Sequence, residues 1–130
     1  MGLQDNKMSK NVHRLRLSFE YAYMGLKHTF LSENNFQIEL IVAVCVLILS
    51  SLLKISKNDW LIVLFCIGLV LAFELMNTAI EAVVDLMTNG QFHPLAKVAK
   101  DCAASAVLCI SICVCIIGIY VFMPYIVNIF

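Results

Sequence analysis

Three long apolar stretches restrict what this 130-residue sequence can fold into. They cover about residues 36–55, 60–87 and 95–125, and each is long enough to cross a bilayer core of roughly 30 Å as a helix. Hydrophobic residues make up 62% of the chain, against roughly 45–50% in soluble domains. We therefore predict an all-α integral membrane protein with three transmembrane helices.

The short length limits any activity to what the spans and their flanks can build. A separate soluble catalytic domain has no room, so residues 1–130 are expected to form a single membrane domain. The formal net charge is zero and no basic tract is present, which argues against nucleic-acid binding. All six cysteines lie in apolar segments without the paired spacing of a zinc site. Packing between helices is their expected role, and redox chemistry is the alternative.

An amphipathic pattern precedes the first span. Between about residues 8 and 31, apolar side chains recur every three or four positions, at Val12, Leu15, Phe19, Tyr23, Leu26 and Phe30. This spacing predicts a surface helix lying in the membrane interface, either as a simple anchor or as part of the substrate site. Polar residues at 32–35, 56–59 and 88–94 predict the turns between elements.

The distribution of basic residues predicts the orientation. Of the nine Lys and Arg residues, five precede the first span, two lie at the start of the third, and only Lys54 and Lys57 lie between the first two spans. The excess of positive charge places the N-terminus and the second loop in the cytoplasm. The polar residues near these segments are then expected at the cytoplasmic interface: Glu33, Glu81, Asp85, Lys100 and Asp101.

The second span carries an unusual polar face. Its members recur at helical spacings of three, four and seven: Glu74, Asn77, Thr78, Glu81 and Asp85. An ionised carboxylate at the bilayer centre costs about 3 kcal/mol even on insertion scales, so this face predicts a working site. Glu74 is expected roughly 16 Å deeper than Asp85 along the helix. Glu39, near the start of the first span, is expected to reach the headgroups.

Acidic and basic residues that suit phosphate chemistry converge on the predicted cytoplasmic side. Magnesium prefers oxygen ligands, usually one or two carboxylates with phosphate oxygens, so Glu33 and Glu81 could share a nucleotide-bound ion. Lys100 is a candidate phosphate contact. No glycine-rich nucleotide motif is present, however, and intramembrane carboxylates also mark cation-coupled transporters. The residues by themselves leave a membrane enzyme and a transporter open.

Two ordered blocks resemble a known family. Residues 74–85, ELMNTAIEAVVD, resemble the signature of the prokaryotic diacylglycerol kinases, which are small integral-membrane lipid kinases. Residues 96–108, AKVAKDCAASAVL, resemble the family's second block at the expected interval. The resemblance covers almost the whole chain and implies ATP-dependent phosphorylation of a membrane lipid alcohol with Mg²⁺. It also implies a homotrimer with active sites shared between protomers in the bacterial inner membrane.

The resemblance assigns expected roles to four residues of the reaction centre. The family's general base falls on Glu74, and its neighbouring amide falls on Asn77. Its metal-binding glutamates fall on Glu33 and Glu81, which also belong to its nucleotide site.

Further family positions concern the nucleotide. The phosphate-binding lysine and the adjacent aspartate fall on Lys100 and Asp101. The basic residue of the surface helix falls on Arg14, with Arg16 as a competing match. Asp85 closes the first block, either as a metal ligand or as a structural contact at the helix end to Lys97 or Lys100.

The lipid acceptor is expected from a finer resemblance. Phe73 before the first block, Asp85-Leu86 at its end and the tail of residues 123–130 are more similar to the undecaprenol kinase branch than to the diacylglycerol kinase branch. Undecaprenol is therefore the expected acceptor, and diacylglycerol is the alternative.

Overall fold

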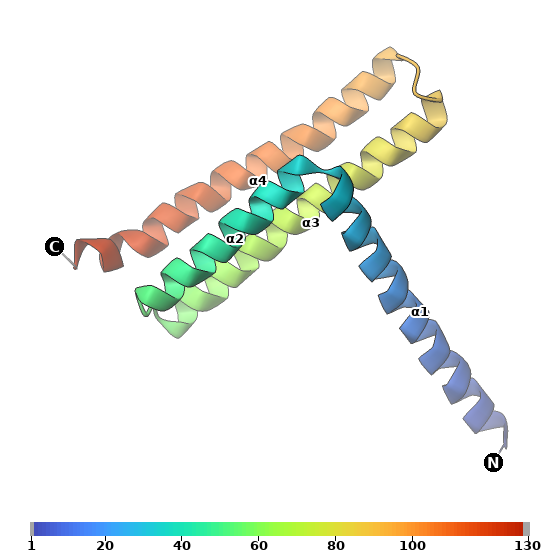
Figure 1. Ribbon diagram of the computed structural model, residues 1–130, viewed down its shortest axis with the longest axis horizontal. Coiled ribbons are helices and arrows are strands. Elements are labelled where there is room, and N and C mark those ends of the chain that lie inside the picture. Colours follow the sequence, from blue (N-terminus) through green and yellow to red (C-terminus); the bar gives the residue numbers. More distant parts are fainter. Residues whose placement is uncertain (1, 129–130) are drawn as a thin grey trace. The chain divides into compact units, whose positions relative to one another are not determined.

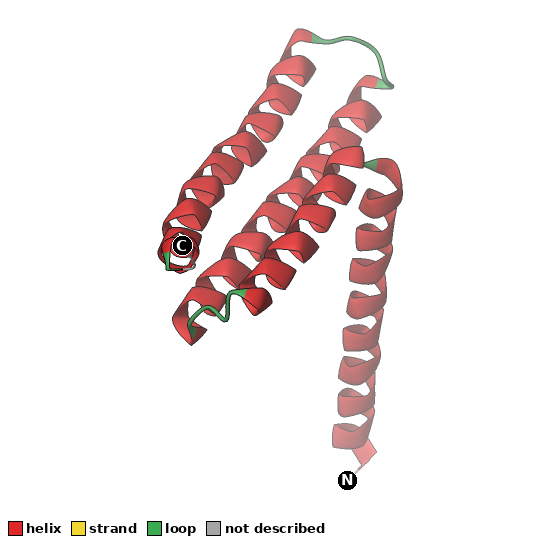
Figure 2. Ribbon diagram, turned by 60° about the vertical axis from the view of Figure 1, so that its left-hand side comes forward, coloured by secondary structure: helices red, strands yellow, loops and turns green. Residues whose placement is uncertain are grey.

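The computed structural model describes residues 2–128, with side chains from residue 11 onward. This part of the chain forms four helices, α1 (Gly2–Ser32), α2 (Asn34–Leu52), α3 (Lys57–Thr88) and α4 (Pro94–Val127), joined by short connections (Figures 1 and 2). Helices α2, α3 and α4 are each long and apolar enough to cross a membrane. The predicted all-helical class is confirmed, as is the presence of three helices long and apolar enough to be membrane spans.

The chain divides into two compact units, Met1–Glu33 and Asn34–Phe130. The first unit contains α1, which is one continuous helix that extends beyond the predicted range of 8–31. Between α1 and α2 only Glu33 is not helical, and its backbone N–H still donates to the carbonyl oxygen of Thr29 at 2.9 Å. The connection lies within the predicted turn at 32–35 but is limited to Glu33, because helical hydrogen bonding continues almost to the start of α2.

Helix α2 ends with a left-handed residue. Lys54 has φ 51°, and two hydrogen bonds reach back across it. The N–H of Ile55 donates to the Ser50 carbonyl at 3.3 Å, and the N–H of Lys54 donates to the Ser51 carbonyl at 3.2 Å. This bonding pattern is the Schellman motif, which closes a helix by satisfying its last carbonyls. It ends α2 at Leu52, whereas the predicted span continued to residue 55.

Helix α3 begins earlier than expected because Ser56 caps it. The Ser56 hydroxyl oxygen accepts a hydrogen bond from the backbone N–H of Asp59 at 3.2 Å, as expected for an N-cap residue. The same hydroxyl donates to the Asp59 carboxylate at 2.7 Å. Residues 57–59, which were predicted to form a turn, therefore belong to the first turn of α3.

The end of α4 is attached to this corner through Tyr125. Its hydroxyl accepts the backbone N–H of Ser56 at 2.9 Å and donates to the carboxylate of Asp59. Beside it lies a small buried apolar cluster centred on Ile55, Val63 and Val121. The polar contact and the cluster together hold the α2–α3 turn against α4.

We expect replacement of Tyr125 by Phe to lower the midpoint of thermal unfolding in detergent by several degrees. The change keeps the ring but removes a donor to a carboxylate and an acceptor for a backbone N–H. Tyr120→Phe is the matched control on the same helix, since Tyr120 is 82% exposed. Equal midpoints for both variants would show that the Tyr125 hydroxyl contributes nothing to stability.

Helix α3 lies at the centre of the second unit. It packs most extensively against α4 and less extensively against α2, while α2 and α4 make no close backbone approach to each other within the described residues. Ala103 of α4 is buried, as expected for a small residue that lets helices approach closely.

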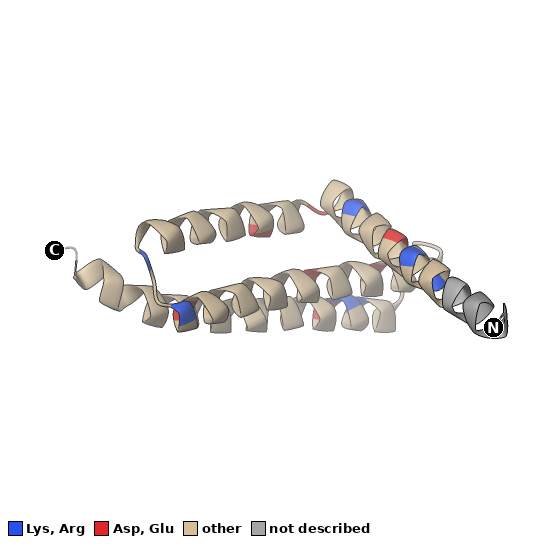
Figure 3. Ribbon diagram, turned by 90° about the horizontal axis from the view of Figure 1, so that it is seen from below, with Lys and Arg blue, Asp and Glu red and all other residues tan. Residues whose placement is uncertain are grey.

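The unequal helix lengths create a projecting end. Helices α3 and α4 have 32 and 34 residues, or about 48 and 51 Å, whereas α2 has 19 residues, or about 29 Å. The α3–α4 connection therefore lies beyond the start of α2 (Figure 1). Charged residues in the second unit lie mostly near the helix ends, with long uncharged stretches between them (Figure 3). The projecting end carries Glu81, Asp85, Lys97, Lys100 and Asp101.

Candidate active site

The polar face of α3 changes from buried to exposed along the helix. Glu74 is 2% exposed and Thr78 is 8% exposed. One turn later Glu81 is half-buried, and Asp85 is exposed. The Thr78 hydroxyl donates to the backbone carbonyl oxygen of Glu74 at 3.1 Å, one helical turn away. A buried carboxylate therefore lies on the same face as acids that a water-soluble nucleotide could reach.

Asn77 and Glu81 form a local pair on this face. The Asn77 side-chain amide donates to Oε1 of Glu81 at 3.2 Å, one helical turn away. The Asn77 Oδ1 atom is buried and has no hydrogen-bond partner among the described residues. Because a buried amide oxygen without a partner is costly, this atom is suited to accept a donor or to ligate a cation.

The corner between α3 and α4 carries two ion pairs. Lys100 Nζ lies 2.7 Å from Oδ1 of Asp85, so this pair joins the two helices. Lys97 pairs with Asp101 within α4. Asp85 therefore contacts Lys100, one of the two lysines that the sequence left open. The Glu81 carboxylate also attracts the Lys100 ammonium electrostatically.

The N-cap of α4 fixes the start of the helix that carries these two lysines. His93 is the N-cap of α4, its Nδ1 accepts the backbone N–H of Leu95 at 3.2 Å, and Pro94 follows in the first turn. Thr88 and Pro94, which were predicted to lie in the loop, are the last residue of α3 and the first residue of α4. The actual connection is residues 89–93.

The oxygen ligands near the corner suit a magnesium ion that arrives with phosphate. Among the described residues no group of three or more His, Cys, Asp or Glu side chains could hold a metal by itself. Magnesium bound with a nucleotide needs only one or two protein carboxylates, because phosphate oxygens and waters complete its shell. Glu81 and the unpartnered oxygen of Asn77 fit such an ion. Glu33 and Arg14 belong to the first unit, and their predicted roles stay predictions.

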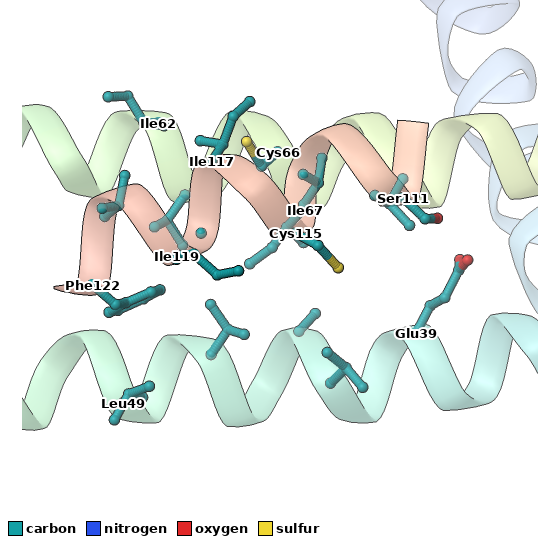
Figure 4. A pocket seen from close by; sticks show the side chains of 18 of the residues that line it. Glu39, Leu49, Ile62, Cys66, Ile67, Ser111, Cys115, Ile117, Ile119 and Phe122 are labelled. Atoms are coloured by element: carbon teal, nitrogen blue, oxygen red, sulfur yellow. The ribbon is translucent and has the colours of Figure 1, made fainter. Parts of the chain in front are cut away.

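An apolar groove of about 820 Å³ is lined by residues of α2, α3 and α4, with α2 on one side and α4 across from it (Figure 4). Its walls are almost entirely aliphatic and aromatic, and Glu39 and Ser111 supply polar groups. Figure 4 shows the Glu39 side chain pointing from α2 across the groove toward the part of α4 that carries Ser111. The groove is long and apolar, as the chain of a lipid requires.

Glu39 is the residue whose environment the sequence did not predict. Its Oε2 atom is buried without a hydrogen-bond partner among the described residues, and its carboxylate interacts electrostatically with that of Glu74. Its carboxylate enters the groove beside α3, and the expectation that Glu39 reaches the headgroups stays a prediction. The available signal was an acidic residue inside an apolar run, as for Glu74 itself.

Comparison with known proteins assigns the chain to a family. Residues 20–122 match the sequence profile described as prokaryotic diacylglycerol kinase. The chain belongs to the prokaryotic diacylglycerol kinase family. Both sequence blocks and Glu33 lie inside the matched segment of this family, whereas Arg14 and Arg16 lie before it.

Relatives within the family carry two names. The undecaprenol kinase of Bacillus subtilis (strain 168) is 43% identical over 121 residues, which cover 92% of this chain and 98% of that protein. The diacylglycerol kinase of Synechocystis sp. is 40% identical over 110 residues, or 85% of this chain and 63% of that protein. The diacylglycerol kinase of Escherichia coli (strain K12) is 31% identical over 88 residues, or 68% and 71% of the two chains.

Proposed function

We propose that this chain is an ATP-dependent kinase that phosphorylates the hydroxyl of a membrane lipid alcohol, with undecaprenol as the acceptor and diacylglycerol as the alternative. The observation that carries this proposal is the 43% identity to an undecaprenol kinase over 98% of that protein's length. The geometry of the second unit supports it, because a buried carboxylate, an exposed corner with cations and acids, and a lipid-sized groove adjoin α3.

Glu74 is the proposed general base. It accepts the proton of the lipid hydroxyl as the oxygen attacks the γ-phosphorus of ATP, and the bond from that phosphorus to the ADP oxygen breaks. Burial removes the water that would otherwise solvate and weaken the base. The neighbouring groove would bring the hydroxyl to this carboxylate from within the membrane.

The α3–α4 corner is the proposed nucleotide site. Lys100 contacts the phosphates, with Asp101 beside it, and Arg14 is proposed as a contact from the surface helix. Glu81 and Glu33 are the proposed carboxylate ligands of Mg²⁺, and Asn77 holds the Glu81 side chain through its amide at 3.2 Å. When bound, Mg²⁺ neutralises charge on the phosphate oxygens.

We further propose a cytoplasmic N-terminus, an α1 that lies in the membrane interface, and a homotrimer with shared active sites. The excess of Lys and Arg before α2 and at the start of α4 supports the orientation. In the most apolar 18-residue stretch of α4, only 6% of the residues are buried within the chain. This leaves a broad apolar face for lipid or a neighbouring protomer. Cross-linking of the purified protein in lipid would test the trimer.

The proposed activity is tested with purified protein in vesicles, labelled ATP and either undecaprenol or diacylglycerol. We expect label transfer that depends on Mg²⁺ and is faster with undecaprenol. Faster transfer to diacylglycerol would replace the acceptor. Ion flux across sealed vesicles without transfer to either lipid would favour the transporter that the residues alone left open.

The groove is tested by filling it at a position where nothing clashes. A Cβ added at Gly118, which lines the groove, meets no atom within 4 Å. We expect Gly118→Phe to raise KM for the lipid about tenfold, the effect of roughly two methylene groups losing their contacts, with KM for ATP unchanged.

Gly68→Phe is the matched control for this variant. A Cβ at Gly68 is equally unobstructed, but this residue lies outside the groove lining. Equal lipid KM values for the two variants would contradict the assignment of the groove to the lipid chain.

A further inference from the structure

The ion pair between Asp85 and Lys100 differs in kind from its neighbour. Lys97 and Asp101 lie four residues apart on one helix, whereas the Asp85–Lys100 pair joins the last turns of α3 to the beginning of α4. The Lys100 Nζ atom lies 2.7 Å from Oδ1 of Asp85. This pair holds the Lys100 ammonium at the corner where phosphate is proposed to bind.

The backbone of Asp85 is itself fixed at the end of α3. Its carbonyl oxygen accepts the N–H groups of Asn89 and Gly90, the latter at 3.1 Å. Both residues adopt left-handed conformations, with φ 51° and 71°, which turn the chain sharply out of the helix. The carboxylate therefore projects from a backbone position that hydrogen bonds determine.

Asp85 also competes with Glu81 for the same cation. Glu81 attracts the Lys100 ammonium, but the closest carboxylate oxygen belongs to Asp85. Glu81 instead accepts a hydrogen bond from Asn77. If Asp85 lost its charge, Glu81 would be the remaining acid to attract the Lys100 side chain. A pair between Lys100 and Glu81 would neutralise a carboxylate that is proposed to bind Mg²⁺.

We infer that Asp85 is a positioning residue that holds the Lys100 ammonium for a nucleotide phosphate and keeps it off Glu81. The inference rests on the proposed function, because it assigns a role within that nucleotide site. Asp85 acts through Lys100, so its contribution disappears when Lys100 is absent. Replacement of Asp85 by Asn keeps the backbone carbonyl that ends α3 and nearly keeps the side-chain shape. The variant therefore tests the charge of the Asp85 side chain.

The test is a double-mutant cycle with Asp85→Asn, Lys100→Met and the combined variant, read by equilibrium binding of ATP in EDTA to the protein in detergent. We expect Asp85→Asn to weaken ATP binding about tenfold in the Lys100 background and by less than twofold when Lys100 is Met. Asp85→Glu should recover most of the loss. Asp59→Asn, which removes an acid from the other end of α3, should leave binding unchanged.

A second measurement, the Mg²⁺ requirement of the activity, tests whether Asp85 keeps Lys100 away from Glu81. Asp85→Asn should raise the Mg²⁺ concentration needed for half-maximal activity, and adding Lys100→Met should reverse that rise. Equal weakening by Asp85→Asn with and without Lys100, or equal losses for Asp85→Asn and Asp85→Glu, would overturn the inference. The proposed function would be refuted by a different result, namely that the unmodified chain transfers no phosphate to either lipid. The double-mutant cycle is independent of that result, because it measures ATP binding in EDTA and not phosphate transfer.

Discussion

Replacement of Glu74 by Gln is expected to lower turnover by about 10²–10⁴-fold, the usual contribution of a general base. The amide is nearly the same size as the carboxylate but cannot accept the hydroxyl proton. Because Glu74 lies on the buried part of α3, whereas the proposed phosphate contacts are at the projecting end, ATP affinity should change little. Turnover in vesicles and equilibrium ATP binding measure the two effects separately.

Ser50→Ala is the matched control for Glu74→Gln. Ser50 is fully buried on α2, where its hydroxyl donates to the Val46 carbonyl at 2.8 Å. It tests whether any change at a buried polar residue lowers activity through folding, and we expect near-normal turnover. Near-normal turnover in the Glu74→Gln variant would remove Glu74 from the role of base.

Replacement of Glu81 by Gln should raise the Mg²⁺ concentration for half-maximal activity by at least about 100-fold. Loss of a partner that only orients a metal ligand already reduces metal affinity by about 10–100-fold, so loss of a direct ligand should exceed that range. Glu33→Gln should act in the same direction if it supplies the second carboxylate. The measurement is lipid phosphorylation over a Mg²⁺ titration at saturating ATP.

The control for both metal-site variants is Asp59→Asn. Asp59 is an acid on the same helix as Glu81, but it contacts Ser56 and Tyr125 at the opposite end of α3. Its removal should leave the Mg²⁺ requirement unchanged in protein that remains folded. An unaltered Mg²⁺ titration for Glu81→Gln and Glu33→Gln alike would contradict the metal assignment.

Much of the architecture could be predicted from the sequence because it depends on local patterns. Runs of apolar residues predicted three membrane helices, and the structure confirms three helices of that kind. Their ends were less predictable. Ser56 was expected in a turn but caps α3, and Lys54 ends α2 in a left-handed conformation that lysine rarely adopts. Such ends depend on hydrogen bonds formed by single residues.

The candidate site also has parts that local sequence patterns predict and parts that they do not. Helical spacing was enough to predict that Glu74, Asn77 and Glu81 share a face, since they lie on one continuous helix. The groove could not be predicted, because it is formed by three helices packed together. The position of the Glu39 side chain in the groove likewise depends on that packing. The metal role of Glu33 stays a prediction, because it lies in a different unit of the chain from Glu81.

The sequence by itself determined the membrane class, the number of spans and the polar face of α3, because hydropathy and helical periodicity are properties of contiguous residues. Only the tertiary structure decided that Asp85 pairs with Lys100 rather than Lys97, and that Tyr125 bonds to Asp59. These contacts depend on how α3 and α4 are rotated and shifted against each other. Packing of the complete helices sets that geometry, and no local pattern encodes it.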